Sequence, residues 1–388
     1  MNASVLAIQP QVLFIVLINP YGCGMKRMHC LDGLRGGLAV YVMISHMAPF
    51  AAAPAWLLGP LSHGMAAVDV FFVLSGMVIL LSLEGFGFRA APFLVARVFR
   101  IFPVFLIVFL SALAIQPLMV AYEAMPWIEA GSPAHGIWAD GWPSDWAGNI
   151  AVHLTMMHGL FPDGAWPNVY LGFLGAAWSL STEWQFYLLV VLCARPGRQQ
   201  ILVAGFLALS AGSILWQAAT LEAWHFSRAF LPNKAQYFAL GLASATVLRD
   251  RDPARFGVVL GAVLALCWVQ GGGDKLAAPL VWTICLAAEM QFSRLLAPLA
   301  GLLRSRPLVW LGSISFCVYL VNEPVQKLLG VALARIAGGN QILFTLLWLP
   351  LALLLPIGLS WWLHESIERP ALRFGRHWLR NAGNASTA

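Results

Sequence analysis

Charged residues are scarce in this chain of 388 residues: they make up 10% of it, against about 25% in soluble domains. Hydrophobic residues make up 60%, and the mean hydropathy is +0.76. The apolar and polar residues do not alternate with the period of two that is typical of a membrane β-barrel. The composition therefore excludes a soluble globular domain. The net charge of +6 does not indicate nucleic-acid binding, because the basic residues lie at the ends of apolar runs instead of forming one patch.

Several common signatures of chemistry are also missing. The sequence contains no glycine-rich phosphate loop, no nucleophile elbow and no zinc motif. The six cysteines show no Cys-x-x-Cys spacing and lie mostly within apolar runs, so we interpret them as small packing residues and expect no metal site. They are Cys23, Cys30, Cys193, Cys267, Cys285 and Cys317.

Long apolar runs fill most of the chain. Many are about 18 to 22 residues long, which is the length that an α-helix needs to cross a hydrocarbon core of roughly 30 Å. The pattern predicts an all-α, polytopic integral membrane protein with about ten transmembrane helices and no separate soluble domain. The predicted segments are 33–50, 68–84, 101–122, 172–193, 201–219, 234–248, 256–270, 276–291, 308–332 and 341–363.

The two ends of the chain are predicted to lie outside this membrane domain, which we place at 25–380. Residues 1–24 are mildly apolar but lack a basic start and a small-residue cleavage site, so a cleaved signal peptide is not expected. Two interpretations stay open: an extra N-terminal interfacial helix, or a segment upstream of the native start at Met25. Residues 381–388 are expected to be a disordered tail.

Basic residues divide unequally between the two sides of the predicted bundle. If the chain before the first of the ten helices is cytoplasmic, 18 of the 23 lysines and arginines lie on the cytoplasmic side, and the alternation holds through every loop. The positive-inside rule then predicts that both ends of the ten-helix core are cytoplasmic. The five basic residues on the other side are Arg228, Lys234, Lys275, Lys327 and Arg335.

The longest connection, 123–170, falls on the outer side and contains acidic residues but no lysine or arginine. It is rich in tryptophan, which suits either an interfacial aromatic belt or a surface on which sugars stack. The tryptophans are Trp127, Trp138, Trp142, Trp146 and Trp166.

The first predicted helix carries an arginine and a histidine on one face. Arg35 and His46 are eleven residues apart, which corresponds to about three turns and roughly 16 Å along a helix. A cation and an imidazole on one stripe of an apolar helix need a polar neighbour, so we expect this stripe to line a reaction channel. His46 is a candidate general base, although a packing histidine is the alternative.

Two acidic residues are candidates to orient that histidine. Asp69 opens the second helix, where an acid that complements the helix dipole is the alternative interpretation. Glu183 lies well inside the fourth helix, and Tyr187 follows it on the same face.

Polar residues also mark the third and ninth helices. Arg97 and Arg100 precede the third helix and share a helical face, so they serve either as topological anchors or as bidentate partners for phosphates. Ser315, Tyr319 and Asn322 share a face of the ninth helix, where a polar helix interface is the alternative.

Five motifs occur in a fixed order between about residues 29 and 374. The chain resembles the acyltransferase 3 family of membrane acyltransferases, whose members commonly O-acetylate polysaccharides and other acceptors. The resemblance implies about ten core helices, an acyl-CoA donor taken from the cytoplasm, and catalytic roles for the arginine and histidine of the first motif. The motifs are Leu31-Asp-Gly-Leu-Arg-Gly36 with His46, Asp69-Val-Phe-Phe-Val-Leu-Ser-Gly76, Arg97-x-x-Arg100, Trp178-Ser-Leu-Ser-x-Glu183 and Ile367-Glu-Arg-Pro370.

The ninth helix departs from the family pattern. Family members often have a histidine where this chain has Asn322, and Phe316 replaces another aromatic residue. Asn322 can donate and accept hydrogen bonds but cannot titrate, so proton handling or acceptor choice is expected to differ.

We therefore predict an enzyme of a bacterial inner membrane that transfers an acyl group, such as acetyl, from acyl-CoA to a hydroxyl of a glycan or a lipid-linked sugar. Its partners would be acyl-CoA, the acceptor and membrane lipids, and no nucleic acid. A proton-coupled transporter is the main alternative, and a scaffold without chemistry is a third. The predicted catalytic residues are His46, Glu183 and Asp69. The predicted donor site comprises Arg35, Arg97, Arg100 and Ser75, with Ser75 beside a small-residue gap that admits the pantetheine arm, and the predicted substrate contacts are Trp178, Tyr187, Tyr319 and Asn322.

Overall fold

The computed structural model describes residues 28–118, 125–128, 132, 134–135 and 142–385. The N-terminal segment predicted at 1–24 and the middle of the 123–170 connection lie outside these residues.

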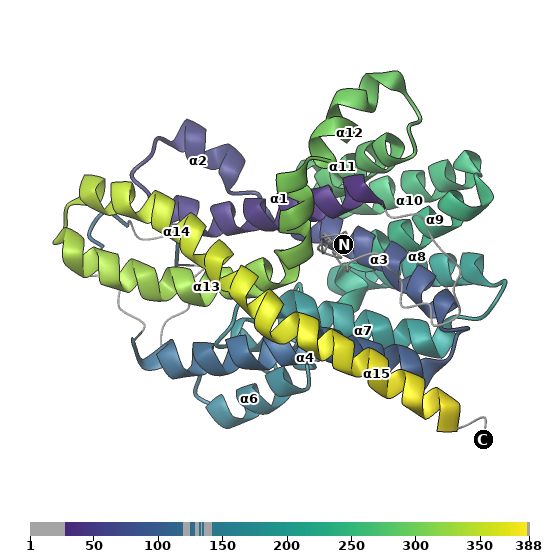
Figure 1. Cartoon of the computed structure of the whole chain (residues 1–388), viewed down its shortest axis with the longest axis horizontal. Helices are drawn as coiled ribbons and strands as arrows, with labels where there is room; N and C mark the ends of the chain where they lie inside the picture. The colour runs from purple at the N-terminus through teal and green to yellow at the C-terminus, as the bar shows by residue number, and fades with distance from the viewer. Residues whose placement is uncertain (1–27, 119–124, 129–131, 133, 136–141, 386–388) are drawn as a thin grey trace, which may run out of the picture.

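The described residues form α-helices joined mainly by short turns, and they contain no β-strand. Figure 1 shows the helices gathered in one bundle, in which α1 and α3 lie centrally. The α-helices are α1 (His29–Met47), α2 (Ala55–Leu61), α3 (Gly64–Gly85), α4 (Ala90–Ile115), α6 (Trp146–Leu154), α7 (Ala177–Cys193), α8 (Gln199–Ala219), α9 (Ala235–Asp250), α10 (Pro253–Gly271), α11 (Gly273–Glu289), α12 (Ala297–Leu303), α13 (Arg306–Ala337), α14 (Gln341–Leu363) and α15 (Arg369–Ala385). Short 3-10 turns are η1 (Ala48–Phe50), η2 (Gln116–Leu118), η4 (His158–Leu160), η5 (Val169–Leu171), η6 (Glu222–Trp224), η7 (Leu231–Asn233) and η8 (Arg294–Leu296), and η9 (His364–Glu368) is a π-helical turn.

Each of the ten predicted apolar segments overlaps a long helix, so the all-α class is confirmed. By length and composition, six helical stretches of the described chain could cross a membrane, or seven if the bent pair of α11 and α12 with its preceding turn counts as one. The predicted number of ten is therefore not confirmed. Three of the other helices, α7, α9 and α11, have 17, 16 and 17 residues, which is at the lower limit for a perpendicular span.

In two places the helical chain extends beyond the predicted segment. The third helix was expected to begin at 101, but α4 begins at Ala90, so Arg97 and Arg100 lie within it instead of before it. The last predicted helix, 341–363, has the bounds of α14, but η9 joins α14 directly to α15, so the chain stays helical where we expected a basic segment at the cytoplasmic surface. In both places we treated charged residues as helix ends, although arginine and glutamate have good helix propensity. Helix α15 also extends to Ala385, into the segment predicted to be a disordered tail.

Glycines allow the central helices to pack closely. A methyl group at Gly36 would overlap the backbone of α13 at Leu308, and a methyl group at Gly312 would overlap the carbonyl of Asp32. Gly36 of the first motif and Gly312 therefore bring α1 against α13, which holds Arg35 and His46 beside the polar face of α13.

The glycine of the second motif has the same effect between α3 and α9. A methyl group at Gly76 would overlap the carbonyl of Phe238, and one at Gly241 would overlap the carbonyl of Val73. The contact at Gly76 and Gly241 thus fixes α9 against α3 next to Ser75, and the passage for a pantetheine arm beside Ser75 stays a prediction.

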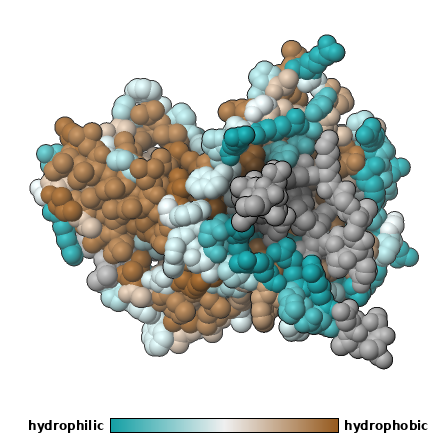
Figure 2. Space-filling view, in the orientation of Figure 1, coloured by the Kyte–Doolittle hydropathy of each residue, from teal (hydrophilic) through white to brown (hydrophobic). Residues whose placement is uncertain are grey.

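Much of the molecular surface is apolar. Leu346, Leu354 and Trp361 on α14 are more than half exposed, and Figure 2 shows apolar side chains covering the region of α13 and α14. Helix α15 is amphipathic, and its Phe374 packs on Phe99 of α4 with ring centroids 5.5 Å apart. The exposed apolar belt is what a lipid-facing surface requires.

Candidate active site

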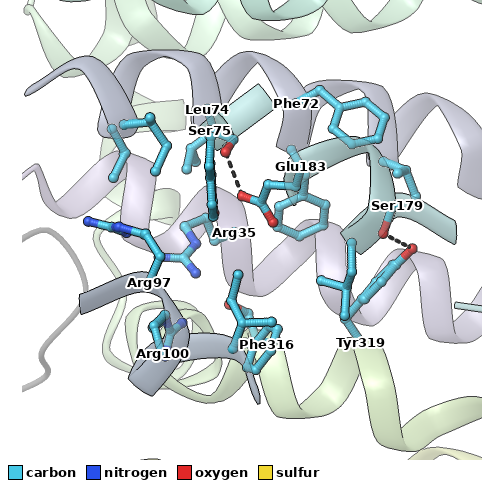
Figure 3. Close-up of a pocket in the computed structure, with 18 of the residues that line it drawn as sticks. Arg35, Phe72, Leu74, Ser75, Arg97, Arg100, Ser179, Glu183, Phe316 and Tyr319 are labelled. Atoms are coloured by element: carbon cyan, nitrogen blue, oxygen red, sulfur yellow. Dashed lines mark hydrogen bonds between the residues drawn. The ribbon is translucent and has the colours of Figure 1, made fainter. Parts of the chain in front are cut away.

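A cavity of about 170 Å³ opens between α1, α3, α4, α7 and α13. We call it the arginine cavity, because Arg35, Arg97 and Arg100 all line it (Figure 3). Of the residues that the structure describes, Glu183 is the one carboxylate that lines it. The lining therefore carries an excess of positive charge, and the cavity brings together three arginines that come from separate motifs.

Aromatic side chains and hydrogen bonds hold two of these arginines in place. The Arg97 guanidinium lies over the Phe93 ring, 5.2 Å from its centroid, and donates a hydrogen bond to Ser82. The Arg100 guanidinium lies 5.0 Å from the centroid of the Phe316 ring. Both arginines are thus oriented before any ligand binds, which lowers the entropic cost of binding.

A second group of side chains supports Arg100 from behind. Arg100 forms an ion pair with Glu368, whose side chain is buried. Glu368 also accepts hydrogen bonds from Cys317, at 3.1 Å, and from Nδ1 of His364, at 2.8 Å. These last three residues could hold a metal ion by geometry, but the guanidinium of Arg100 already neutralises the carboxylate. We therefore interpret the group as a support for Arg100, and Glu368 explains the glutamate of the fifth motif.

Two hydrogen bonds cross the arginine cavity (Figure 3). Ser75 donates to Oε1 of Glu183 at 2.5 Å, and Ser179 donates to the hydroxyl oxygen of Tyr319 at 2.8 Å. Tyr187 also lines this cavity. Glu183 thus faces the arginines instead of His46.

A second cavity, of about 190 Å³, contains His46. We call it the histidine cavity. Trp178, Tyr319, Arg228 and Glu323 are among the residues that line it. Tyr319 and Val68 line both cavities, so the two spaces meet at these side chains. Arg35 and His46 lie toward opposite ends of α1. Arg35 lines the arginine cavity, and His46 lines the histidine cavity.

The partner of His46 is Asn322. Oδ1 of Asn322 lies 2.8 Å from Nδ1 of His46, and Asn322 is fully buried. Nδ2 of Asn322 donates to the carbonyls of Val318, at 2.9 Å, and Tyr319, at 2.6 Å. These two acceptors fix the amide with its oxygen toward the histidine. In the neutral imidazole Nδ1 of His46 then carries the proton, and the lone pair lies on Nε2, which has no hydrogen-bond partner among the described residues.

This arrangement differs from the predicted one, in which Glu183 or Asp69 orients His46. Asp69 forms an ion pair with Lys234 at 2.6 Å, and both side chains are buried. The pair ties α3 to α9, and a carboxylate that is neutralised in this way is not available to the histidine. Asn322 was predicted as a substrate contact, but it lies behind His46 and does not line either cavity.

A buried carboxylate that we did not predict closes one wall of the histidine cavity. Glu323 pairs with Lys327 at 2.8 Å and accepts hydrogen bonds from the backbone N–H groups of Gly175, at 3.0 Å, and Ala176, at 2.7 Å. It therefore fixes the start of α7 against α13, as expected for an acid at a helix N-terminus. In the sequence, the position of Glu323 directly after Asn322 and before a proline could have indicated that it belongs to the site.

Comparison with known proteins agrees with this geometry. The family model described as an acyltransferase domain, for the acyltransferase 3 family, matches residues 28–365. The Acyltransferase MdmB of Streptomyces mycarofaciens is 29% identical over 332 residues, which cover 78% of this chain and 79% of that protein. No solved structure matches. The protein belongs to the acyltransferase 3 family of polytopic membrane acyltransferases, and it is an acyltransferase.

Proposed function

We propose that the protein transfers an acyl group, acetyl in the simplest case, from acyl-CoA to a hydroxyl of a glycan or lipid-linked acceptor. The observation that supports this proposal is the pair of cavities that meet at Tyr319. One cavity carries three arginines for an anionic donor, and the other carries a histidine with a free lone pair for an acceptor hydroxyl.

The donor would bind in the arginine cavity. Phosphate groups match the planar N–H fork of arginine, so Arg35, Arg97 and Arg100 would hold the phosphates of CoA. The unequal distribution of basic residues supports placing this end of the bundle at the cytoplasm of a bacterial inner membrane, where acyl-CoA is present. Along α1, the path from Arg35 to His46 is roughly 16 Å, which the pantetheine arm would span.

The acceptor would bind in the histidine cavity. Nε2 of His46 would remove the proton of the acceptor hydroxyl as its oxygen attacks the thioester carbonyl. The carbon–sulfur bond then breaks, the new ester forms, and the imidazolium returns its proton to the sulfur of CoA. Asn322 would keep His46 in the tautomer that this step needs, as the third member of a catalytic triad does.

The test uses purified protein in a neutral detergent with acetyl-CoA. Free thiol is followed with and without hexyl β-D-glucuronide as the acceptor probe, and the probe is analysed by mass spectrometry for an added acetyl group. We expect thiol release that depends on the probe and equals the acetylated product. A transporter or a scaffold would release no thiol. The absence of thiol release would therefore overturn the proposal.

A further inference from the structure

Arg228 lies at the histidine cavity, in the connection between α8 and α9. Its side chain is half-buried. The guanidinium carbon lies 5.5 Å from the centroid of the Tyr170 ring and 5.7 Å from that of the Trp178 ring. Two aromatic rings thus hold this cation at the cavity that contains His46.

The charge of Arg228 is not balanced by an acid. Within the part of the chain that the structure describes, Arg228 forms no ion pair, and its one hydrogen bond goes to the sulfur of Met65 at 3.2 Å, which is a weak acceptor. Glu323, the carboxylate of this cavity, is already neutralised by Lys327 at 2.8 Å and by two backbone N–H groups. The nearby Lys234 is likewise paired with Asp69. Among the described residues, Arg228 is therefore the one cation at this cavity that no carboxylate pairs.

The aromatic contacts do not use the donors of this guanidinium. Contact with a ring occupies the face of the guanidinium, whereas its N–H groups point outward in its plane. A planar or tetrahedral oxyanion can accept two of these N–H groups at once, and such charge-assisted pairs are stronger than neutral hydrogen bonds.

We infer that Arg228 binds an anionic group, a carboxylate or a phosphate, on the acceptor molecule whose hydroxyl lies at His46. The acceptor class would then be acidic sugars or sugar phosphates instead of neutral glycans. The inference rests on the proposed function, which places the acceptor hydroxyl at His46. Binding of the anion at Arg228 can be measured without any acyl transfer.

The experiment compares three probes that share a hexyl β-D-glycoside body: the glucuronide, its neutral amide, and the glucoside 6-phosphate. Binding of each is measured by isothermal titration calorimetry to protein in phosphatidylcholine nanodiscs, without acyl-CoA. We expect the wild type to bind the carboxylate or the phosphate about tenfold more tightly than the amide. Preference for one of the two anions identifies which oxyanion the site accepts.

Variants then assign the preference to one side chain. Arg228→Gln is expected to bind all three probes within about twofold of one another, and Arg228→Lys to keep a reduced preference, because it retains the charge without the planar fork. The matched control is Arg335→Gln, which removes the same charge from an exposed position in the last turn of α13 and should keep the full tenfold preference.

The inference is overturned if the wild type binds the amide as tightly as both anions, or if the preference survives in Arg228→Gln. If Arg228→Gln does not fold, the variant Arg228→Lys is decisive. A full wild-type preference in Arg228→Lys would contradict the recognition of the anion by the planar guanidinium. Acetyl transfer is measured in parallel. An anion preference without transfer would contradict the proposed function alone, and transfer without an anion preference would contradict this inference alone.

Discussion

Replacing Asn322 by leucine tests the support of the catalytic histidine. The two side chains have similar size, but leucine cannot accept the hydrogen bond that Nδ1 of His46 donates over 2.8 Å. Because the imidazole becomes a cation and a stronger donor as it takes up the proton, the loss of this acceptor costs about 1–3 kcal/mol in the transition state. At 1.36 kcal/mol for each factor of ten, we expect kcat to fall by about 5- to 150-fold.

The donor site is separate from this contact, so the KM for acetyl-CoA should stay within about twofold of the wild-type value. The assay is thiol release with hexyl β-D-glucuronide as the acceptor probe, alongside a thermal unfolding curve. Gln326→Leu is the matched control, because Gln326 is also buried in α13 but donates to the carbonyls of Met43 and Ala352 instead of to His46. A folded Asn322→Leu variant with a wild-type kcat would refute the reasoning, as would a variant that changes only the donor KM.

Two further predictions concern the donor site and the packing of the bundle. The double variant Arg97→Ala and Arg100→Ala should raise the KM for acetyl-CoA at least tenfold, because each arginine offers a charge-assisted contact to phosphate; an unchanged KM would show that the two residues serve only as anchors. Gly241→Ala should destabilise the protein by about 1–3 kcal/mol in thermal or denaturant unfolding, since the added methyl group overlaps the carbonyl of Val73. Gly261→Ala in α10 is the control: nothing lies within 4 Å of the added atom, and a lower stability there would contradict the packing argument.

The positions of the helices could be predicted well from the sequence, because lipid imposes a length and a composition on each span. The last long apolar run, 341–363, coincides with α14. The start of α4 could not be predicted, because its first turns hold arginines that face a cavity inside the bundle and therefore do not mark the end of the helix.

Several residues that the sequence marks as candidates line the two cavities. The contacts between these residues could not be predicted. Arg35, Arg97 and Arg100 line one cavity, and they could be grouped from the sequence because motif order and side of the membrane restrict where they can meet. The contact between His46 and Asn322 joins residues 276 positions apart, and no spacing along the chain indicates it. Asp69 was a reasonable candidate for the same role until the structure showed Lys234 beside it.

Arg228 could not be identified as a site residue from the sequence, for a different reason. In the sequence it is one of five basic residues on the outer side, in a connection without a motif, and charge counting treats it as an exception. Only the tertiary structure places it over Trp178 and Tyr170, next to the cavity of His46.

In the proposed mechanism, His46 acts as a base on a hydroxyl while the arginines hold the donor elsewhere. The most direct test measures acetyl transfer and the binding of acetyl-CoA in the variant His46→Gln. This change keeps a polar side chain next to Asn322. We expect acetyl transfer from acetyl-CoA to hexyl β-D-glucuronide to fall by at least about a hundredfold, with the Kd for acetyl-CoA within about twofold of the wild-type value. Wild-type transfer in this variant, or a loss of donor binding that accounts for the lost transfer, would contradict the account.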